Sequence, residues 1–367
     1  MELLKVITDL VKFRTETGNK AEIKDCLQYV KGLFSKTSAQ IEIYEKGDLS
    51  PVILLANTKD KNFDVLVVGH LDVVPAEDNM FSPYIKDGKM YGRGTLDMKS
   101  FAAVGLNSLE YVLDKRLPLK FGVLLSTDEE KGSAGLESYL EDVPEINSKV
   151  VLDVDVAGDI TKIVAKCKNP VFTKLIAEGK EAHGSTPWEG VDANEKLLMV
   201  LHNIRKFYPY YSRELPKPHN TWIDTVHFAK ISGGDIANVI SNYAEALLDF
   251  RLTEKSLVAD LEENLKKCLI DGVTYKIVSS STPVVMDENN PIILQYKELA
   301  ELILGKDIEF EYIGGATDSR EFAKKGSVVI MHSGSGHGMH AKEEYVEIES
   351  VERLADIQIK FLNSFMV

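Results

Sequence analysis

Histidine and acidic side chains follow apolar segments of this 367-residue chain at several points. His70 and Asp72 come directly after the apolar run 64–69, and three acids, Asp128–Glu130, come after the run 121–126. Imidazole nitrogens and carboxylate oxygens are ligands of divalent metal ions, and a nearby carboxylate such as Asp72 can fix the tautomer of a ligating histidine. The spacing therefore predicts a metal site. Taken alone, His70 also fits an ordinary histidine at a strand end beside an aspartate in a turn.

Two loops contain further acidic candidates. Asp97 lies in the segment Tyr91–Lys99, whose two glycines indicate a tight loop before a helix. There it is either the N-cap of that helix or a carboxylate that bridges two metal ions. The three acids after residue 126 repel one another unless cations or protons lie between them. One of them is a candidate metal ligand and a neighbour a candidate general base, with a solvated loop as the alternative.

Two more segments end in possible ligands. Asp153 and Asp155 close the apolar segment 149–155, and strand alternation points them the same way. Asp155 is the better candidate because it lies further toward the carboxyl end. The glycine-rich segment after the last apolar run contains three of the eight histidines: His332, His337 and His340. A glycine-rich loop after a strand suits close approach of the backbone to a ligand.

Together these segments offer two histidines and three or four carboxylates, from four strand ends and one loop. Nitrogen and oxygen donors without thiolates suit Zn²⁺, Mn²⁺ or Co²⁺. Five ligands exceed the four that one tetrahedral zinc ion needs. The set therefore fits a two-metal hydrolase better than a site for a single ion.

The elements that must position these residues follow an α/β pattern. Continuous apolar runs are expected of strands covered on both faces, and they predict strands at 64–69, 121–126, 149–154 and 328–331. Other strands are predicted at 41–44 and 52–56. Apolar spacing of three and four predicts helices at 3–13, 22–34, 99–114, 135–140, 291–304 and 348–365. This alternation predicts a mostly parallel central sheet, and catalytic groups in such sheets gather outside the carboxyl ends of the strands.

A different pattern occupies the middle of the chain. Its predicted elements are strands at 171–178, 225–231, 244–252 and 273–278 and helices at 193–207 and 256–269. Their order, β-α-β-β-α-β, is typical of a ferredoxin-like α+β domain. We therefore predict a discontinuous catalytic domain, residues 1–167 and 282–367, with an inserted domain at residues 168–281.

Composition narrows the classes of function. Hydrophobic residues make up 44% and charged residues 27%, as in soluble globular proteins. The net charge of −14 repels phosphate backbones and argues against nucleic acid as a partner. No stretch approaches the roughly 20 apolar residues of a membrane span, and the N-terminus fits an amphipathic helix rather than a signal peptide. Three widely spread cysteines indicate a reducing, cytoplasmic location: Cys26, Cys167 and Cys268.

Three motifs resemble those of the M20 family of metallopeptidases and amidohydrolases: Gly69-His70-Leu71-Asp72, Tyr91-Gly92-Arg93-Gly94 with Asp97-Met98-Lys99, and Thr127-Asp128-Glu129-Glu130. The family includes aminoacylases, acetylornithine deacetylases, succinyl-diaminopimelate desuccinylases, glutamate carboxypeptidases and dipeptidases. The resemblance covers the chain from its first helix to its last. It implies a zinc-peptidase-like catalytic domain with two divalent metal ions per chain, Zn²⁺ first and Co²⁺ or Mn²⁺ as alternatives.

The resemblance implies five metal ligands: His70 and Asp155 at one ion, Glu130 and His340 at the other, and Asp97 as the bridge. It also makes Asp72 the residue that orients His70, and Glu129 the general base that takes a proton from the water between the metals. Asp153 remains a rival to Asp155, because the family's usual fourth ligand lies in a Gly-Glu-Pro-like stretch that this chain lacks.

The inserted domain carries motifs of the family's lid domain. Ala182–Pro187 resembles the lid motif whose histidine, here His183, reaches the active site of the partner subunit, which implies a homodimer formed through the lid. His183 then donates to the oxyanion; the alternative is an ordinary histidine in a surface turn. The resemblance and the available cationic and backbone donors give five candidate substrate-binding residues: Asn238, Arg251, Arg320, Gly334 and Gly336.

The predicted reaction is hydrolysis of an amide or peptide bond in a small substrate, an N-acyl amino acid or short peptide with a free carboxylate. One alternative is a non-hydrolytic metal- or ligand-binding protein on the same fold, which a missing ligand or base would have indicated; none is missing. A second alternative is hydrolysis of another bond, such as a phosphoester. That reaction favours a basic surface, which a chain of net charge −14 does not offer overall.

Overall fold

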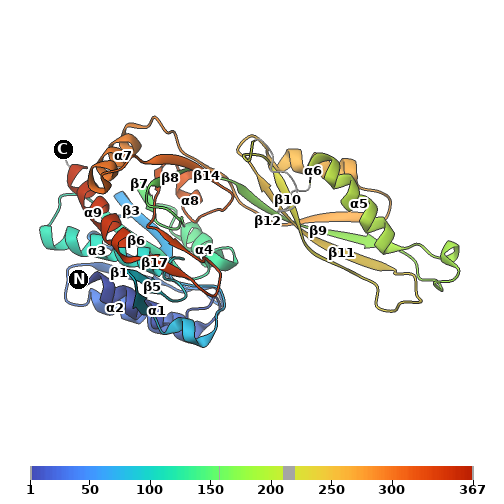
Figure 1. The fold of residues 1–367 in the computed structure, drawn as a ribbon, viewed down its shortest axis with the longest axis horizontal. Coiled ribbons are helices and arrows are strands. Elements are labelled where there is room, and N and C mark those ends of the chain that lie inside the picture. The colour runs from blue at the N-terminus through green and yellow to red at the C-terminus, as the bar shows by residue number, and fades with distance from the viewer. Residues whose placement is uncertain (1, 157, 210–219, 366–367) are drawn as a thin grey trace. The chain divides into compact units, whose positions relative to one another are not determined.

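The computed structural model describes residues 2–156, 158–209 and 220–365 (Figure 1). The chain forms two compact units. The first comprises Met1–Ala165, Met286–Glu311 and Thr317–Val367, and the second comprises Lys166–Val285 and Tyr312–Ala316. The first unit is thus discontinuous in sequence, and every predicted metal ligand belongs to it.

A nine-stranded sheet forms the centre of the first unit, in the order β1-β2-β6-β3-β7-β15-β8-β13, with β14 also paired to β8. Its strands are β1 (Gln40–Tyr44), β2 (Val52–Ala56), β3 (Asn62–His70), β6 (Phe121–Ser126), β7 (Asn147–Asp153), β8 (Lys162–Cys167), β13 (Val284–Val285), β14 (Glu309–Ile313) and β15 (Val328–Met331). By residue number, β13 and the last two residues of β8 and β14 fall within the ranges of the second unit. Strands β8, β13 and β14 are additions to the predicted set.

The sheet is mixed, and the prediction of a mostly parallel sheet is correct only for its centre. Strands β6, β3, β7 and β15 run parallel to their neighbours in that group. The pairs β1–β2, β2–β6, β15–β8 and β8–β13 are antiparallel. The four parallel strands are those predicted from continuous apolar runs. The outer strand β2 is also a buried apolar run but pairs antiparallel, so such a run does not by itself determine the direction of a strand.

Register brings the ends of the parallel strands to one level. His70 pairs with Ser126, Val68 with Asp153, and Met331 with Asp153. The loops that follow β3, β6, β7 and β15 therefore start at the same edge of the sheet. This edge is where open α/β sheets place their functional groups.

The helices of the first unit are α1 (Leu3–Lys12), α2 (Lys20–Leu33), α3 (Lys99–Lys115), α4 (Ala134–Asp142), α7 (Pro291–Leu304), α8 (Arg320–Lys324) and α9 (Ile348–Ser364). Local sequence sets several ends. In α7 the Asn290 side chain caps the first turn, Pro291 occupies the first helical position, and Gly305 ends the helix at φ 64°. Helix α3 packs on β3 and β6 and against α1 and α9.

A small antiparallel sheet completes the first unit, in the order β16-β17-β5-β4. Its strands are β4 (Tyr84–Lys86), β5 (Lys89–Tyr91), β16 (Gly336–His337) and β17 (Tyr345–Glu347). The sequence pattern did not predict these strands, because two or three residues are too few for alternation to appear. Pairing of β17 with β5 places the His340 loop next to the loop that leads to Asp97.

The second unit contains β9 (Asn169–Glu178), α5 (Ala193–Phe207), β10 (Thr225–Gly233), β11 (Tyr243–Leu252), α6 (Val258–Cys268) and β12 (Val273–Ser280). These elements follow the order β-α-β-β-α-β, and the antiparallel sheet runs β10-β11-β9-β12. Alternate residues of β9 and β11 are buried against α5 and α6, which gives this unit its own core. Among the described residues, no helix has both the length and the apolar character required to cross a bilayer.

The packing of α3 on the sheet predicts opposite effects of one substitution at two glycines. A Cβ on Gly105 would lie 2.8 Å from Val67 Cγ1, whereas a Cβ on Gly32, near the end of α2, meets nothing within 4 Å. We expect Gly105→Ala to lower the free energy of unfolding, because overpacking costs about 1–3 kcal/mol. Gly32→Ala should raise it by up to about 1 kcal/mol. Urea unfolding of both variants measures this, and a stabilised Gly105→Ala protein would contradict the close approach.

Candidate metal centre

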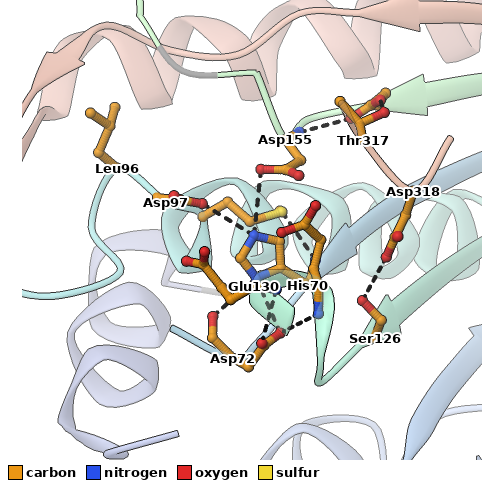
Figure 2. Close-up of polar contacts among 12 residues, drawn as sticks. His70, Asp72, Leu96, Asp97, Ser126, Glu130, Asp155, Thr317 and Asp318 are labelled. Atoms are coloured by element: carbon orange, nitrogen blue, oxygen red, sulfur yellow. Dashed lines mark hydrogen bonds and ion pairs between the residues drawn. The ribbon is translucent and has the colours of Figure 1, made fainter. Parts of the chain in front are cut away.

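Three side chains from separate loops form the first group of possible metal ligands. His70 ends β3, Asp97 precedes α3 and Asp155 follows β7. His70 Nε2 lies 3.1 Å from Asp97 Oδ1 and 3.4 Å from Asp155 Oδ1 (Figure 2). One possible ligand atom from each residue lies within 4.8 Å of the others. The three side chains can therefore hold one ion together.

A second group of possible ligands shares Asp97 with the first. His340 Nε2 lies 3.0 Å from Asp97 Oδ2 and 3.2 Å from Glu130 Oε2. The two oxygens of Asp97 thus face two different histidines, His70 and His340. A carboxylate in this position can contact two metal ions at once. The structure brings together all five residues predicted as ligands.

Asp72 is buried beside His70 and holds the acidic turn in place. Its carboxylate accepts hydrogen bonds from the backbone N–H groups of Glu129 and Glu130, at 3.1 and 3.3 Å. It also accepts one from Thr17 Oγ1 at 2.7 Å, a residue that no sequence pattern had indicated. The Asp72 carbonyl oxygen lies 3.0 Å from His70 Nδ1, closer than its carboxylate at 3.4 Å. Asp72 therefore positions both the His70 ring and the turn that presents the two glutamates.

Asp155, and not Asp153, faces the ligand groups. The Asp153 carboxylate is buried and accepts hydrogen bonds from the hydroxyls of Thr317 and Ser319. Its other oxygen accepts the backbone N–H of Asp155 at 2.9 Å. Strand alternation pointed both aspartates the same way, but β7 ends at Asp153, so the rule does not extend to Asp155. Thr317 and Ser319 thus help to hold the loop that carries this ligand.

The structure gives Arg320 partners other than the predicted substrate. Arg320 is 7% exposed, and its Nη1 donates to the Thr317 carbonyl oxygen at 3.0 Å. Its guanidinium nitrogens lie 3.3–3.4 Å from three carboxylates: Glu137, Asp318 and Glu321. These partners account for the residue as part of the protein interior. The role of Arg320 in binding substrate stays a prediction.

Asp318, in the same segment, holds the acidic turn from both ends. One carboxylate oxygen accepts a hydrogen bond from Ser126, where β6 ends (Figure 2). The other accepts one from Ser133, just before α4. The residues between these serines include both glutamates of the turn. The segment that was expected to contact substrate instead supports the turn from within the domain.

Gly334 and Gly336 are required by close packing. A Cβ on Gly334 would lie 2.9 Å from the Phe101 ring, and one on Gly336 would overlap the Tyr345 carbonyl oxygen. The Gly336 N–H donates to the Gly158 carbonyl oxygen at 3.2 Å, so it is not available to a substrate as predicted. Gly336 lines a cavity of about 550 Å³ whose lining includes none of the five ligand candidates.

The other two C-terminal histidines lie outside both ligand groups. His332 is buried, with Nδ1 3.0 Å from the Tyr296 hydroxyl and Nε2 2.8 Å from the Ile160 carbonyl oxygen. Burial lowers the pKa of His332 to about 4, so the ring is neutral. His337 is exposed on β16. Of the three histidines in this segment, His340 is therefore the one that meets the acidic residues.

The second unit carries three predicted site residues. His183 and Asn238 are both exposed and adjacent: Gly184 N–H donates to the Asn238 carbonyl oxygen at 2.8 Å. Arg251 is half-buried on β11. Its guanidinium makes a two-pronged contact with Asp249, at 2.8 and 3.0 Å, which fixes its orientation.

The ligand groups contain more carboxylates than compensating cations. Burial raises the pKa of Asp155 from 3.8 to about 8, against the attraction of His70. Burial and the charge of Asp155 raise the pKa of Glu129 well above its ordinary value. Hydrogen bonds to Asp97 and Glu130 raise the pKa of His340 to about 10. Asp97 is the exception, because hydrogen bonds from His340 and His70 outweigh its burial and lower its pKa.

This donor set fits divalent metal ions. Glu130 Oε1 is buried and has no hydrogen-bond partner, although buried carboxylate oxygens nearly always have one. Glu130 belongs to the second ligand group, in which Asp97 offers a carboxylate oxygen and His340 a ring nitrogen to the same space. In the metal-free protein, bound protons offset the negative charge of these carboxylates. Two divalent ions would take over that role. Imidazole and carboxylate ligands without thiolate suit Zn²⁺, Co²⁺ and Mn²⁺.

Comparison with known proteins identifies the family of this chain. The profile of Peptidase family M20/M25/M40 matches residues 66–364. The chain belongs to the M20 family. It is 27% identical to a probable succinyl-diaminopimelate desuccinylase of Staphylococcus aureus, over 97% of this chain and 95% of that one. It is 25% identical to the acetylornithine deacetylase of Pasteurella multocida, over 85% and 83%.

Solved structures share the M20 fold along the whole chain. An M20 family metallo-carboxypeptidase from Sulfolobus solfataricus superposes with a TM-score of 0.83 at 18% identity, covering 100% of this chain and 99% of that one. The mixed sheet and its flanking helices are therefore those of an M20 peptidase. The protein is an M20 metallohydrolase of peptide or amide bonds.

The raised pKa values predict how pH acts on the metal-free protein. Folding raises the pKa values of Asp155 and His340, so protonation of these residues stabilises the folded protein. This stabilisation is complete below the ordinary pKa of each residue. It is lost as pH rises through about 8 for Asp155 and about 10 for His340. Metal ions bind the deprotonated ligands. We expect the Tm of chelator-treated protein to fall between about pH 6 and about pH 8, and Co²⁺ to raise Tm more at the higher pH. Scanning fluorimetry measures both, and a Co²⁺ effect of equal size at the two pH values would contradict the site.

Proposed function

We propose that this M20 metallohydrolase cleaves the amide or peptide bond of a small substrate with a free carboxylate, an N-acyl amino acid or a short peptide, using two divalent metal ions. The observation that carries the proposal is the sharing of Asp97, whose two oxygens face His70 and His340. Asp97 would bridge the ions, with Asp155 completing one site and Glu130 the other. Zn²⁺ is the first candidate for both positions.

Glu129 is proposed as the general base. When bound, the ions would make an attacking water more acidic and stabilise negative charge in the transition state. Glu129 lies next to the ligand Glu130 but belongs to neither ligand group. Burial beside Asp155 raises the pKa of its carboxyl group, which favours uptake of a proton. The same carboxyl group can then deliver that proton to the leaving amine.

The second unit, proposed here as the lid at residues 168–281, would supply the groups that bind substrate. The backbone N–H of Ser185 lies 3.1 Å from His183 Nδ1 and makes that nitrogen an acceptor. The neutral ring then carries its proton on Nε2, where it can donate to an oxyanion. Arg251, already aligned by Asp249, is the proposed partner of the substrate carboxylate, and Asn238 is a further proposed contact.

The same unit is proposed to join two copies of the chain. Strand β10 lies at an edge of its sheet and exposes most of its side chains, including Ile231. Helix α5 exposes Leu198 and Met199, which are more than half accessible. An exposed edge strand with apolar side chains can pair with its own copy around a two-fold axis.

A substrate panel tests the proposed function. The enzyme is treated with chelator and reloaded with Zn²⁺ or Co²⁺. Acetyl and succinyl amino acids, dipeptides and a phosphoester are then assayed side by side. Cleavage of amides or peptides that depends on the added metal is expected. Turnover of the phosphoester alone, or full activity in strong chelator, would refute the proposal.

Replacement of the proposed base tests its role directly. Glu129→Gln keeps the size of the side chain but cannot take a proton, and general base catalysis contributes about 10²–10⁴-fold. We expect kcat to fall at least that far while metal content stays near that of the wild type. The matched variant Glu130→Gln should lose metal as well as rate. Activity of Glu129→Gln within about tenfold of wild type would exclude this residue as the base.

Subunit mixing tests whether His183 acts in the partner's active site. Loss of one oxyanion donor costs about 10²–10³-fold in rate, so His183→Ala should be nearly inactive, as should Glu129→Gln. After subunit exchange, a mixed dimer would contain one site with both groups intact, and activity should partly return. A mixture that remains inactive although exchange is demonstrated, or a fully active monomer, would show that His183 does not act across subunits.

A further inference from the structure

A buried carboxylate outside the ligand set connects the two loops that meet at the metal centre. Glu344 lies four residues after His340 and is 1% exposed. It contacts neither the side chain of a ligand nor the substrate-binding residues proposed above. A buried charge is costly unless it is paired and hydrogen-bonded, so its partners determine its role.

One oxygen of Glu344 gathers the loop that precedes α3. Glu344 Oε1 accepts backbone N–H groups from Gly94 at 2.9 Å, Leu96 at 2.8 Å and Asp97 at 3.1 Å. Converging N–H groups of this kind form a concave site for an anion. Without the carboxylate, these donors would remain buried without the acceptor that now holds them. The last of them belongs to the shared ligand Asp97 itself.

The other contacts of Glu344 tie this loop to the His340 segment. Glu344 Oε2 accepts a hydrogen bond from the buried Arg93 guanidinium, which also donates to the Ala341 carbonyl oxygen at 3.2 Å. In return, the Glu344 carbonyl oxygen accepts the Gly92 N–H at 3.1 Å. Residues 92–97 and 341–344 are therefore joined in both directions.

We propose that Glu344 is a positioning residue that sets the placement of Asp97 relative to His340, and so determines the affinity of the second metal site. The inference rests on the proposed two-metal function. The first site depends less on this contact, because His70 ends β3 and Asp155 lies two residues beyond the end of β7, its paired neighbour. His340 has no such support and reaches Asp97 from a loop at φ 59°. Loss of Glu344 should therefore weaken one site selectively.

Three variants test this proposal. Glu344→Gln keeps an oxygen for the three N–H groups but places an amide NH₂ group toward Arg93, a donor against a donor. Arg93→Lys keeps a positive charge but loses the two-pronged link to Glu344 and Ala341. Glu343→Gln, at an exposed neighbouring position, removes the same charge without touching the loop and is the matched control.

Calorimetric titration of each chelator-stripped full-length protein with Co²⁺ gives the affinity of each site. We expect two sites of wild-type affinity in Glu343→Gln. In Glu344→Gln and Arg93→Lys, the first site should stay within about threefold, while the second weakens about 10–100-fold, as is usual when a residue that supports a ligand is changed. When less Co²⁺ than protein is present, the absorption spectrum of these two variants should show Co²⁺ at the first site alone.

Other outcomes have distinct meanings. Two sites of wild-type affinity in both Glu344→Gln and Arg93→Lys, or equal weakening of both sites in folded protein, would overturn the positioning role. If Glu344→Gln does not fold by circular dichroism, Arg93→Lys alone decides between these results. Wild-type protein that binds fewer than two ions would instead refute the proposed function and leave the contacts of Glu344 with a purely structural explanation.

Discussion

Crowding of carboxylates around the buried His70 and the exposed His340 is the constraint on which the catalytic unit depends. Asp97 lies between His70 and His340 and offers one oxygen to each. Further acids approach the same space, and unpaired charge is costly where water is excluded. The protein can tolerate this arrangement only with protons or cations among the acids. The proposed function makes use of the same arrangement, because it needs two adjacent cations.

A second set of buried acids holds the loops that carry the candidate ligand carboxylates. Asp72, Asp153 and Asp318 belong to neither ligand group, and each accepts hydrogen bonds from hydroxyl or backbone donors. These fully bonded carboxylates anchor the loops after β3, β6 and β7. The ligand carboxylates are thereby left with oxygens free for a cation, as Glu130 Oε1 shows. Separation of anchoring acids from ligating acids is how one acidic region serves both stability and chemistry.

The sequence indicated the five candidate ligands that the structure brings together, but not the residues that support them. A ligand such as His70 follows an apolar strand, and that position is visible in the hydropathy pattern. The choice of Asp155 over Asp153 was open, because it depends on where β7 ends. Arg320 was expected to contact substrate, yet its partners come from positions as distant as Glu137, and no local pattern indicates such contacts. Strands β8, β13 and β14 were missed for the same reason, since pairing with a neighbour, and not their own composition, makes them strands.

The order of the five proposed ligands along the chain has a consequence for biosynthesis. Four of the five precede residue 156, whereas His340 follows the entire second unit. A chain still being synthesised can present His70, Asp97 and Asp155 while the last ligand has not yet been translated. Strand β15, which pairs with β7 in the centre of the sheet, is translated equally late. The central sheet and the proposed metal centre are therefore both incomplete until this late part of the chain has been translated.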